Sequence, residues 1–197
     1  MYLSDYTPQV ITGLSFLAIV GQIIILVVAI LLLADLFKKK QSAILQWVSR
    51  HGILLMFIAA LTATCGSLFF SEIANFVPCK DCWFQRIFMY PQVILLAISL
   101  WKRDRTIARY ILALSIIGIL ISTSHYIEQV QAAMQPIASN ATASPLKPCD
   151  ASGVSCASTQ IKFAFGYITI PLMAWTVFGL NILGSIIMMR SDSRKKQ

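Results

Sequence analysis

Long apolar runs separated by short polar segments are the main pattern of this chain. The runs cover residues 10–36, 53–70 (or from residue 47), 83–101, 107–127 and 163–189. A helix needs about 20 predominantly apolar residues to cross a hydrocarbon core about 30 Å thick, and each run reaches or approaches that length. Because lipid offers no hydrogen-bond partners to the backbone, we expect each run to be helical. The pattern therefore predicts an all-α integral membrane protein, a bundle of five transmembrane helices.

The composition agrees with a membrane protein. Of the 197 residues, 57% are hydrophobic and only 12% are charged, whereas a typical soluble domain has about 25% charged residues. The first run lacks the basic flank of a signal peptide, since no Lys or Arg precedes it and Lys38, Lys39 and Lys40 follow it. We therefore expect this run to be retained as a span.

The basic residues predict an orientation. Eleven of the 16 Lys and Arg residues fall in the segments after the first run, between the third and fourth runs, and after the fifth, and a twelfth, Arg109, lies just inside the fourth run. Basic residues collect in cytoplasmic segments, so the pattern predicts an external N-terminus and a cytoplasmic C-terminus. The net charge of +8 could also indicate a nucleic-acid surface. We expect no nucleic-acid partner, because the charges alternate with the spans.

Four of the five cysteines fall in the two loops predicted to lie outside the cytoplasm, residues 71–82 and 131–162. These cysteines are Cys79, Cys82, Cys149 and Cys156. Disulfides persist in such oxidising compartments. Cys65 lies inside the second run, and we expect it to be a buried small apolar residue.

Cys79 and Cys82 form a CxxC motif directly before the third run. Such a motif can close a disulfide or bind a metal ion. Because Pro78 precedes it and Trp83 opens the apolar run, we expect Cys82 near a helix N-terminus, where a thiolate is favoured. Arg86, one helical turn further on, would also stabilise a thiolate or an anionic ligand.

Arg86 and His125 are polar residues inside apolar runs. A charge within a span is costly unless it reaches the interface, finds a partner or serves a site. Arg86 could simply extend to the lipid headgroups, and His125 could be structural. However, His125 lies about 27 Å from the cytoplasmic end of its span, which gives it a depth similar to that of Cys82 and Arg86. We therefore consider the three residues candidates for one site near the outer interface.

Cys149 and Cys156 are separated by six residues rich in Gly, Ser and Asp, which allow the chain to turn back. Two cysteine pairs outside the cytoplasm can form a relay, in which a partner's thiolate attacks one pair and exchange passes electrons to the other. The electrons must then be removed. We find no flavin, haem or nucleotide motif, and a membrane quinone is the acceptor that requires the least protein machinery.

The run from Pro78 to Pro91 (PCKDCWFQRIFMYP) closely resembles the signature of the DsbB (disulfide bond formation protein B) family. The order of helices and cysteine loops over residues 51–189 is similar as well. The resemblance implies an oxidase in the bacterial inner membrane that re-oxidises an exported DsbA-like, thioredoxin-fold protein. Its cofactor would be ubiquinone or menaquinone, and no metal is expected.

The resemblance also implies residue roles. Cys149 would form the mixed disulfide with the partner, and Cys156 would be its mate. Cys79 would exchange with this second pair, while Cys82 would contact the quinone as a thiolate. Arg86 and His125 would bind and polarise the quinone.

The same resemblance divides the chain into three parts. Residues 1–46 would be an additional N-terminal helix with a basic cytoplasmic linker, 47–190 the four-helix core, and 191–197 a basic tail. The additional helix and the close spacing of the second cysteine pair depart from the family pattern. Two alternatives are a vitamin K epoxide reductase-like thiol oxidoreductase and a non-enzymatic membrane protein with structural or zinc-binding cysteines.

Overall fold

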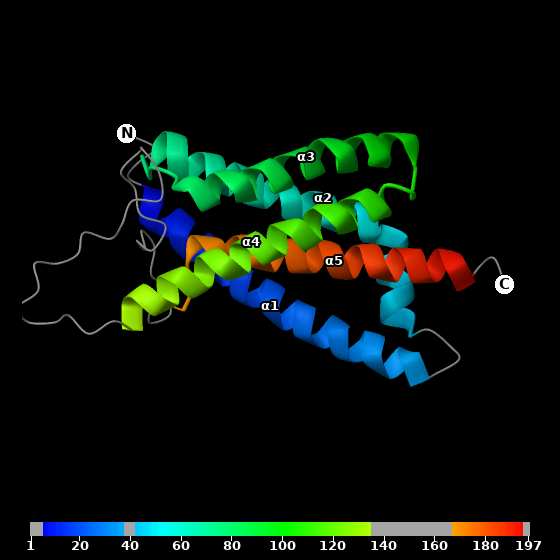
Figure 1. Ribbon diagram of the computed structural model, residues 1–197. Helices are drawn as coiled ribbons and strands as arrows, with labels where there is room; N and C mark the ends of the chain where they lie inside the picture. Colours follow the sequence, from blue (N-terminus) through cyan, green and yellow to red (C-terminus); the bar gives the residue numbers. More distant parts are fainter. Residues whose placement is uncertain (1–5, 38–41, 135–166, 195–197) are drawn as a thin grey trace, which may run out of the picture.

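The computed structural model describes residues 6–37, 42–134 and 167–194 (Figure 1). In this part of the chain the regular elements are all helical: α1 (Thr7–Phe37), α2 (Ala43–Leu68) with its π-helical continuation η2 (Phe69–Ile73), α3 (Lys80–Lys102), α4 (Ala108–Met134) and α5 (Ile170–Arg194). The five α-helices are each long and apolar enough to cross a membrane. The prediction of an all-α bundle with five spans is thus confirmed.

Some helix boundaries differ from the expected ones. The second helix continues through the π-turn to Ile73, and the third begins at Lys80, so the intervening loop is shorter than the predicted 71–82. The fourth helix extends to Met134, into the segment predicted as the second loop. The last helix begins at Ile170 instead of residue 163 and ends at Arg194. Polar residues therefore extend the helices beyond the purely apolar runs.

Helix α5 is the centre of the bundle and the most buried of the five spans. It packs against α1, α2 and α4, while α3 packs against α2 and α4 and closes the ring. The additional helix α1 lies outside this ring, mainly against α5 (Figure 1). The four helices α2–α5 therefore form the core, and α1 is an outer layer on one side of it.

Close helix packing depends on small residues opposite large ones. A Cβ atom added at Gly118 of α4 would lie 2.4 Å from the ring of Phe178, which is fully buried on α5. Likewise, a Cβ atom at Gly52 of α2 would lie 2.7 Å from the sulfur of Met188. Association of helices in lipid relies on such close van der Waals contact, because lipid tails are as apolar as the helices.

A buried polar group joins three helices in the middle of the bundle. The Gln92 side-chain oxygen on α3 accepts hydrogen bonds from Asn181 Nδ2 (2.7 Å) on α5 and from Ser115 Oγ (3.2 Å) on α4. Gln92 Nε2 donates in turn to the Phe88 carbonyl at 2.9 Å. These bonds fix how α3, α4 and α5 face one another.

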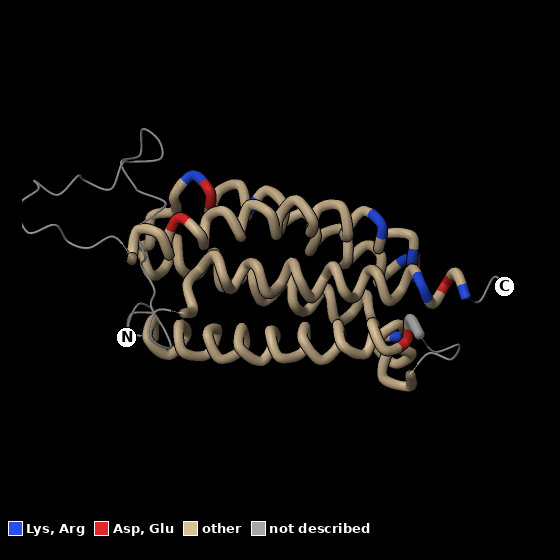
Figure 2. The backbone as a smooth tube through the Cα atoms, turned by 60° about the horizontal axis from the view of Figure 1, so that its bottom comes forward, with Lys and Arg blue, Asp and Glu red and all other residues tan. Residues whose placement is uncertain are grey.

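Most of the Lys and Arg residues in the described part of the chain lie at the end of the bundle that carries the C-terminus (Figure 2). Here Arg105, between α3 and α4, forms an ion pair with Asp192 of α5 at 3.2 Å. The same guanidinium donates to the Ser49 carbonyl and hydroxyl of α2, at 2.9 and 3.0 Å. One arginine thus ties three parts of the chain together at this end. The CxxC motif lies at the opposite end, at the start of α3.

Candidate functional site

The loop between η2 and α3 places Cys79 at the start of a helix. Asn75 has a φ of 56°, in the left-handed region that Asn tolerates better than most residues. After Pro78, Cys79 is the N-cap residue of α3, with extended backbone angles (φ −73°, ψ 174°). Its carbonyl accepts the Trp83 N–H at 3.2 Å, which starts the helical hydrogen-bond series. Cys82 consequently lies in the first turn of α3, three residues after Cys79.

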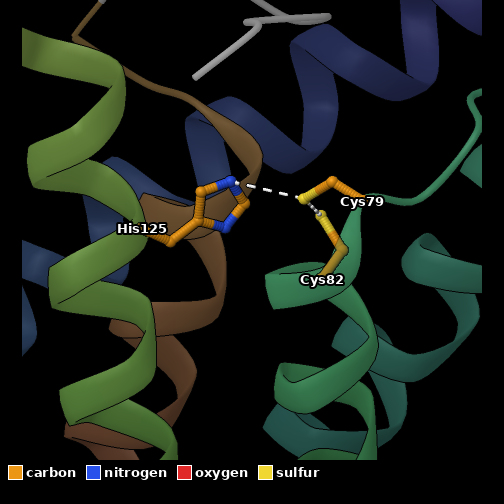
Figure 3. Close-up of side chains that lie close together, drawn as sticks. All are labelled: Cys79, Cys82 and His125. Atoms are coloured by element: carbon orange, nitrogen blue, oxygen red, sulfur yellow. Dashed lines mark hydrogen bonds between the residues drawn. The ribbon is translucent and has the colours of Figure 1, made fainter. Parts of the chain in front are cut away.

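Cys79, Cys82 and His125 form a compact group that we call the thiol–histidine cluster (Figure 3). The two sulfurs are 3.3 Å apart, and both thiols are free. Nε2 of His125, which reaches in from α4, lies 3.6 Å from the Cys79 sulfur. Cys79 and His125 are buried, with 5% and 1% of their surfaces exposed. A dithiol beside an imidazole can carry out thiol–disulfide exchange, or hold a thiophilic metal ion.

Cys79 is the sulfur that carries the negative charge in the dithiol form. The Cys82 thiol hydrogen bond lowers the pKa of Cys79 most, His125 and the Cys82 backbone N–H lower it further, and burial opposes them, with a result of about 4. This differs from the sequence-based expectation of a thiolate at Cys82. The reason is that the Cys82 thiol and His125 both lie against the Cys79 sulfur and stabilise its thiolate.

Gln85 fixes the orientation of His125. Its side-chain nitrogen lies 3.1 Å from His125 Nδ1. The Gln85 amide therefore holds one ring nitrogen of His125, while the other, Nε2, faces Cys79. Gln129 Nε2, one turn along α4, is a longer 3.5 Å from His125 Nε2. Gln85 was not singled out from the sequence, although a glutamine next to Arg86 inside an apolar run is a signal that could have revealed it.

Arg86 does not join the thiol–histidine cluster but faces α2. Its Nε donates to the Ser67 hydroxyl at 3.0 Å, and a terminal nitrogen donates to the Ser67 carbonyl at 3.2 Å. The guanidinium also lies 5.2 Å from the centre of the Trp83 ring, within the range of a cation–π interaction. Tyr90 donates to the same Ser67 hydroxyl at 3.1 Å. Arg86 is therefore held inside the protein by specific partners and is not simply extended to the lipid headgroups.

A cavity of about 360 Å³ lies next to the cysteine pair. This is within the range of about 300–1,000 Å³ that is typical of small-molecule sites. Cys82, Gln85, Arg86 and Ser67 line one part of it, and apolar side chains of α1, α2 and α5 line most of the rest. Cys79 and His125 are not among its lining residues. The two sulfurs therefore face different surroundings, Cys79 towards His125 and Cys82 towards the cavity. Such a cavity suits an amphiphile with a polar head.

The structure thus brings together four of the predicted site residues at one end of the bundle, as a cluster of three with Arg86 on the cavity side. Cys149 and Cys156 lie outside the described residues, so their predicted roles stay predictions. Cys65 is exposed on α2 and not buried as expected.

Comparison with known proteins identifies relatives with related names. The sequence profile of the family described as "Disulfide bond formation protein DsbB" matches residues 49–189. Disulfide bond formation protein C of Bacillus subtilis (strain 168) is 44% identical over 126 residues, which are 64% of this chain and 83% of that protein. A probable disulfide formation protein of Oceanobacillus iheyensis is 36% identical over 143 residues, 73% of this chain and 92% of that protein. No solved structure matches the chain.

Proposed function

The chain belongs to the DsbB family of disulfide bond formation proteins, and we propose that it is a protein-disulfide:quinone oxidoreductase of the bacterial inner membrane. In this proposal an exported DsbA-like protein delivers electrons to Cys149 and Cys156. They continue through Cys79 and Cys82 to ubiquinone or menaquinone. The observation that supports the proposal most is the position of Cys82: it belongs to the dithiol and also lines a cavity large enough for a small molecule.

The cavity residues fit a quinone. Arg86 and Gln85 offer hydrogen-bond donors where they line the cavity, and the remaining lining is mostly apolar. Arg86 also carries a permanent positive charge, which favours an anion on a bound ring oxygen or on the Cys82 sulfur. When bound, a quinone supplies an acceptor for two electrons and two protons.

The two cysteines have different tasks in the proposed exchange. A thiolate of the second pair attacks Cys79 in the Cys79–Cys82 disulfide, which forms a mixed disulfide and releases Cys82 as a thiolate beside the cavity. The remaining thiol of the second pair then resolves the mixed disulfide and releases Cys79 as a thiolate, and the proton that this thiol loses is taken up by Cys82. This leaves the second pair oxidised and the Cys79/Cys82 pair reduced, so two electrons have moved.

The reduced pair is prepared for re-oxidation by its neighbours. Cys79 is a thiolate at neutral pH, stabilised by the Cys82 thiol and by the His125 N–H. When the disulfide re-forms, Cys82 gives up its proton and two electrons leave the pair. The second proton that the acceptor requires comes from solvent, and His125 beside Cys79 is the buried group positioned to pass protons on this side.

The proposed orientation follows from the charges. In the described part of the chain, Lys and Arg gather at the end with the C-terminus, as the positive-inside rule requires of a cytoplasmic end (Figure 2). The thiol–histidine cluster would then face the oxidising side, where the partner protein works. Labelling of single cysteines introduced at each end of the bundle, with a membrane-impermeant reagent on intact cells, tests this orientation.

The central experiment is anaerobic mixing of the purified, oxidised protein with a reduced DsbA-like protein and a soluble quinone. We expect reduction of the quinone in proportion to oxidation of the partner. Cys79→Ser and Cys82→Ser should each abolish it, and the control Cys65→Ser should not. Quinone reduction that persists in the Cys79→Ser or Cys82→Ser protein would contradict the proposed relay.

A further inference from the structure

The additional helix α1 forms one wall of the cavity beside Cys82. The family profile begins at residue 49, after the end of α1 at Phe37. The cavity is nevertheless lined by six residues of this helix: Leu14, Leu17, Ala18, Val20, Gly21 and Ile24. In the four-helix core alone, these positions would be occupied by lipid. The cavity owes this wall to a part of the chain for which family membership gives no role.

Specific contacts hold α1 in one register against the core. A Cβ atom added at Gly21 would lie 2.6 Å from the Thr176 side chain, so α1 and α5 approach closely there. Gln22 donates to the Thr176 hydroxyl at 3.3 Å and accepts from the Tyr167 hydroxyl at 2.9 Å. On α2, the Leu14 side chain fills the space beside Gly66. Helix α1 is therefore packed directly against the core at these positions and is not separated from it by lipid.

The chemistry of the cavity changes from one part to another. The polar groups that α2 and α3 contribute beside the dithiol are those of Ser67, Cys82, Gln85 and Arg86. Helix α1 contributes only apolar groups, over the eleven residues from Leu14 to Ile24, which are ten helical steps apart. At 1.5 Å per residue this face is about 15 Å long. A ligand that matches the whole cavity has a polar head and an apolar chain that follows α1.

The cavity also opens on the outer surface of the bundle. Leu17 and Ile24 line it and are 54% and 46% exposed, and Ile58 of α2 lines it and is 52% exposed. Helix α1 packs more extensively on α5 than on α2, so the opening lies between α1 and α2. A chain too long for the cavity can leave through this opening into the lipid.

We propose that α1 is a binding wall for the isoprenoid tail of the quinone whose ring lies beside Cys82, and that it makes the protein prefer tailed quinones over tail-less rings. This inference rests on the proposed function and adds a role for the helix that lies outside the family profile. The ring would bind the polar part of the cavity. The first units of the tail would lie against Leu17, Ala18 and Ile24, and the rest would continue into the membrane.

A matched pair of double variants tests the proposal. Leu17→Trp/Ile24→Trp enlarges two half-exposed residues that line the cavity. Ile23→Trp/Ile30→Trp makes the same kind of change at two residues of the same helix that are 56% and 55% exposed and are not cavity residues. In both double variants the two substituted residues are seven positions apart on α1, so we expect both variants to affect folding to a similar extent.

The readout is equilibrium binding to the full-length protein in lipid nanodiscs. A long-tailed quinone and the matching tail-less ring are titrated separately, and Kd is obtained from the rise in the thermal unfolding midpoint. We expect the cavity-facing variant to bind the long-tailed quinone about tenfold more weakly, the effect of losing about two buried methylene contacts. Its affinity for the tail-less ring, and both affinities of the control variant, should equal those of the wild type.

Each other outcome has a defined meaning. If both quinones bind the wild type and the cavity-facing variant equally well, the proposal for α1 is wrong while the proposed function stands. Equal affinity of the wild type for tailed and tail-less quinones also overturns the proposal, because the wall then holds lipid. Loss of affinity in both double variants assigns the effect to helix packing and overturns it too. If neither quinone binds the wild type, the proposed function itself fails.

Discussion

Replacing His125 by Ala should raise the pKa of Cys79 without abolishing its thiolate. The Cys82 thiol is the main cause of the low pKa, and His125 is the next favourable contact. A hydrogen bond to a charged group is worth about 1.5–3 kcal/mol, and about 1.4 kcal/mol corresponds to one pH unit. Loss of His125 should therefore move the thiolate titration from about 4 upwards by about one to two pH units. It should stay below the value of about 8.5 for a free cysteine.

The measurement needs a protein in which this dithiol is the only source of thiolate absorbance. A background with three serine substitutions provides it, at Cys65, Cys149 and Cys156. In the reduced protein, the ultraviolet absorbance of the thiolate is followed as the pH is lowered. Because the folded-state pKa is depressed, the thiolate signal should be constant at neutral pH and disappear as the pH falls through about 4.

Two comparisons make this result decisive. Cys82→Ala removes the largest cause, so it should raise the midpoint further than His125→Ala does. His125→Gln restores a possible donor and should fall between the wild type and His125→Ala. A wild-type midpoint near 8.5, or a midpoint that His125→Ala leaves unchanged, would refute the assignment of the charge to Cys79.

Three further predictions concern other parts of the molecule. Arg86→Ala should raise the KM for quinone by about tenfold or more, the value of one charge-assisted hydrogen bond, with little change in thermal stability; if the variant merely unfolds, Arg86 acts through its bonds to Ser67. Gly118→Val should destabilise the protein by about 1–3 kcal/mol, seen as a lower thermal midpoint, because the side chain meets Phe178. Gly13→Val, where nothing lies within 4 Å, is its neutral control. Added Cd²⁺ should inhibit the reduced form only, by binding the thiol–histidine cluster, whose ligand atoms lie within 4.8 Å of one another; equal inhibition of the oxidised form would contradict this.

The sequence was sufficient to predict the helices because lipid leaves the backbone few alternatives. An apolar run of span length has to pair its amides internally, so the runs became helices. The boundaries were less predictable, since polar residues continued the helices past the apolar runs. At Ser71 the chain even remains helical through a π-turn. The third helix begins at Lys80, and that small difference decides which cysteine occupies the cap.

The candidate site was predictable residue by residue but not as an arrangement. Cys82, Arg86 and His125 could be placed at one depth from their positions in the spans. Depth carries no information about direction around a helix, however, so the separation of Arg86 from the thiol–histidine cluster emerged only from the packing. Gln85 contacts that cluster through its bond to His125, and no pattern in a single sequence states which polar side chains will pair.

The polar contacts of Gln92 bear on how the protein is made. Helix α3 is the least apolar of the five described spans, and it carries Gln85, Arg86 and Gln92. The side-chain oxygen of Gln92 has both of its hydrogen bonds only when Asn181 is present, and Asn181 belongs to α5, which follows α3 and α4 in the chain. A growing chain would therefore hold α3 at the insertion machinery, or in a loosely seated position, until α5 arrives. Firm seating of α3, whose first turn holds Cys82, would then wait until α5 has entered the bilayer.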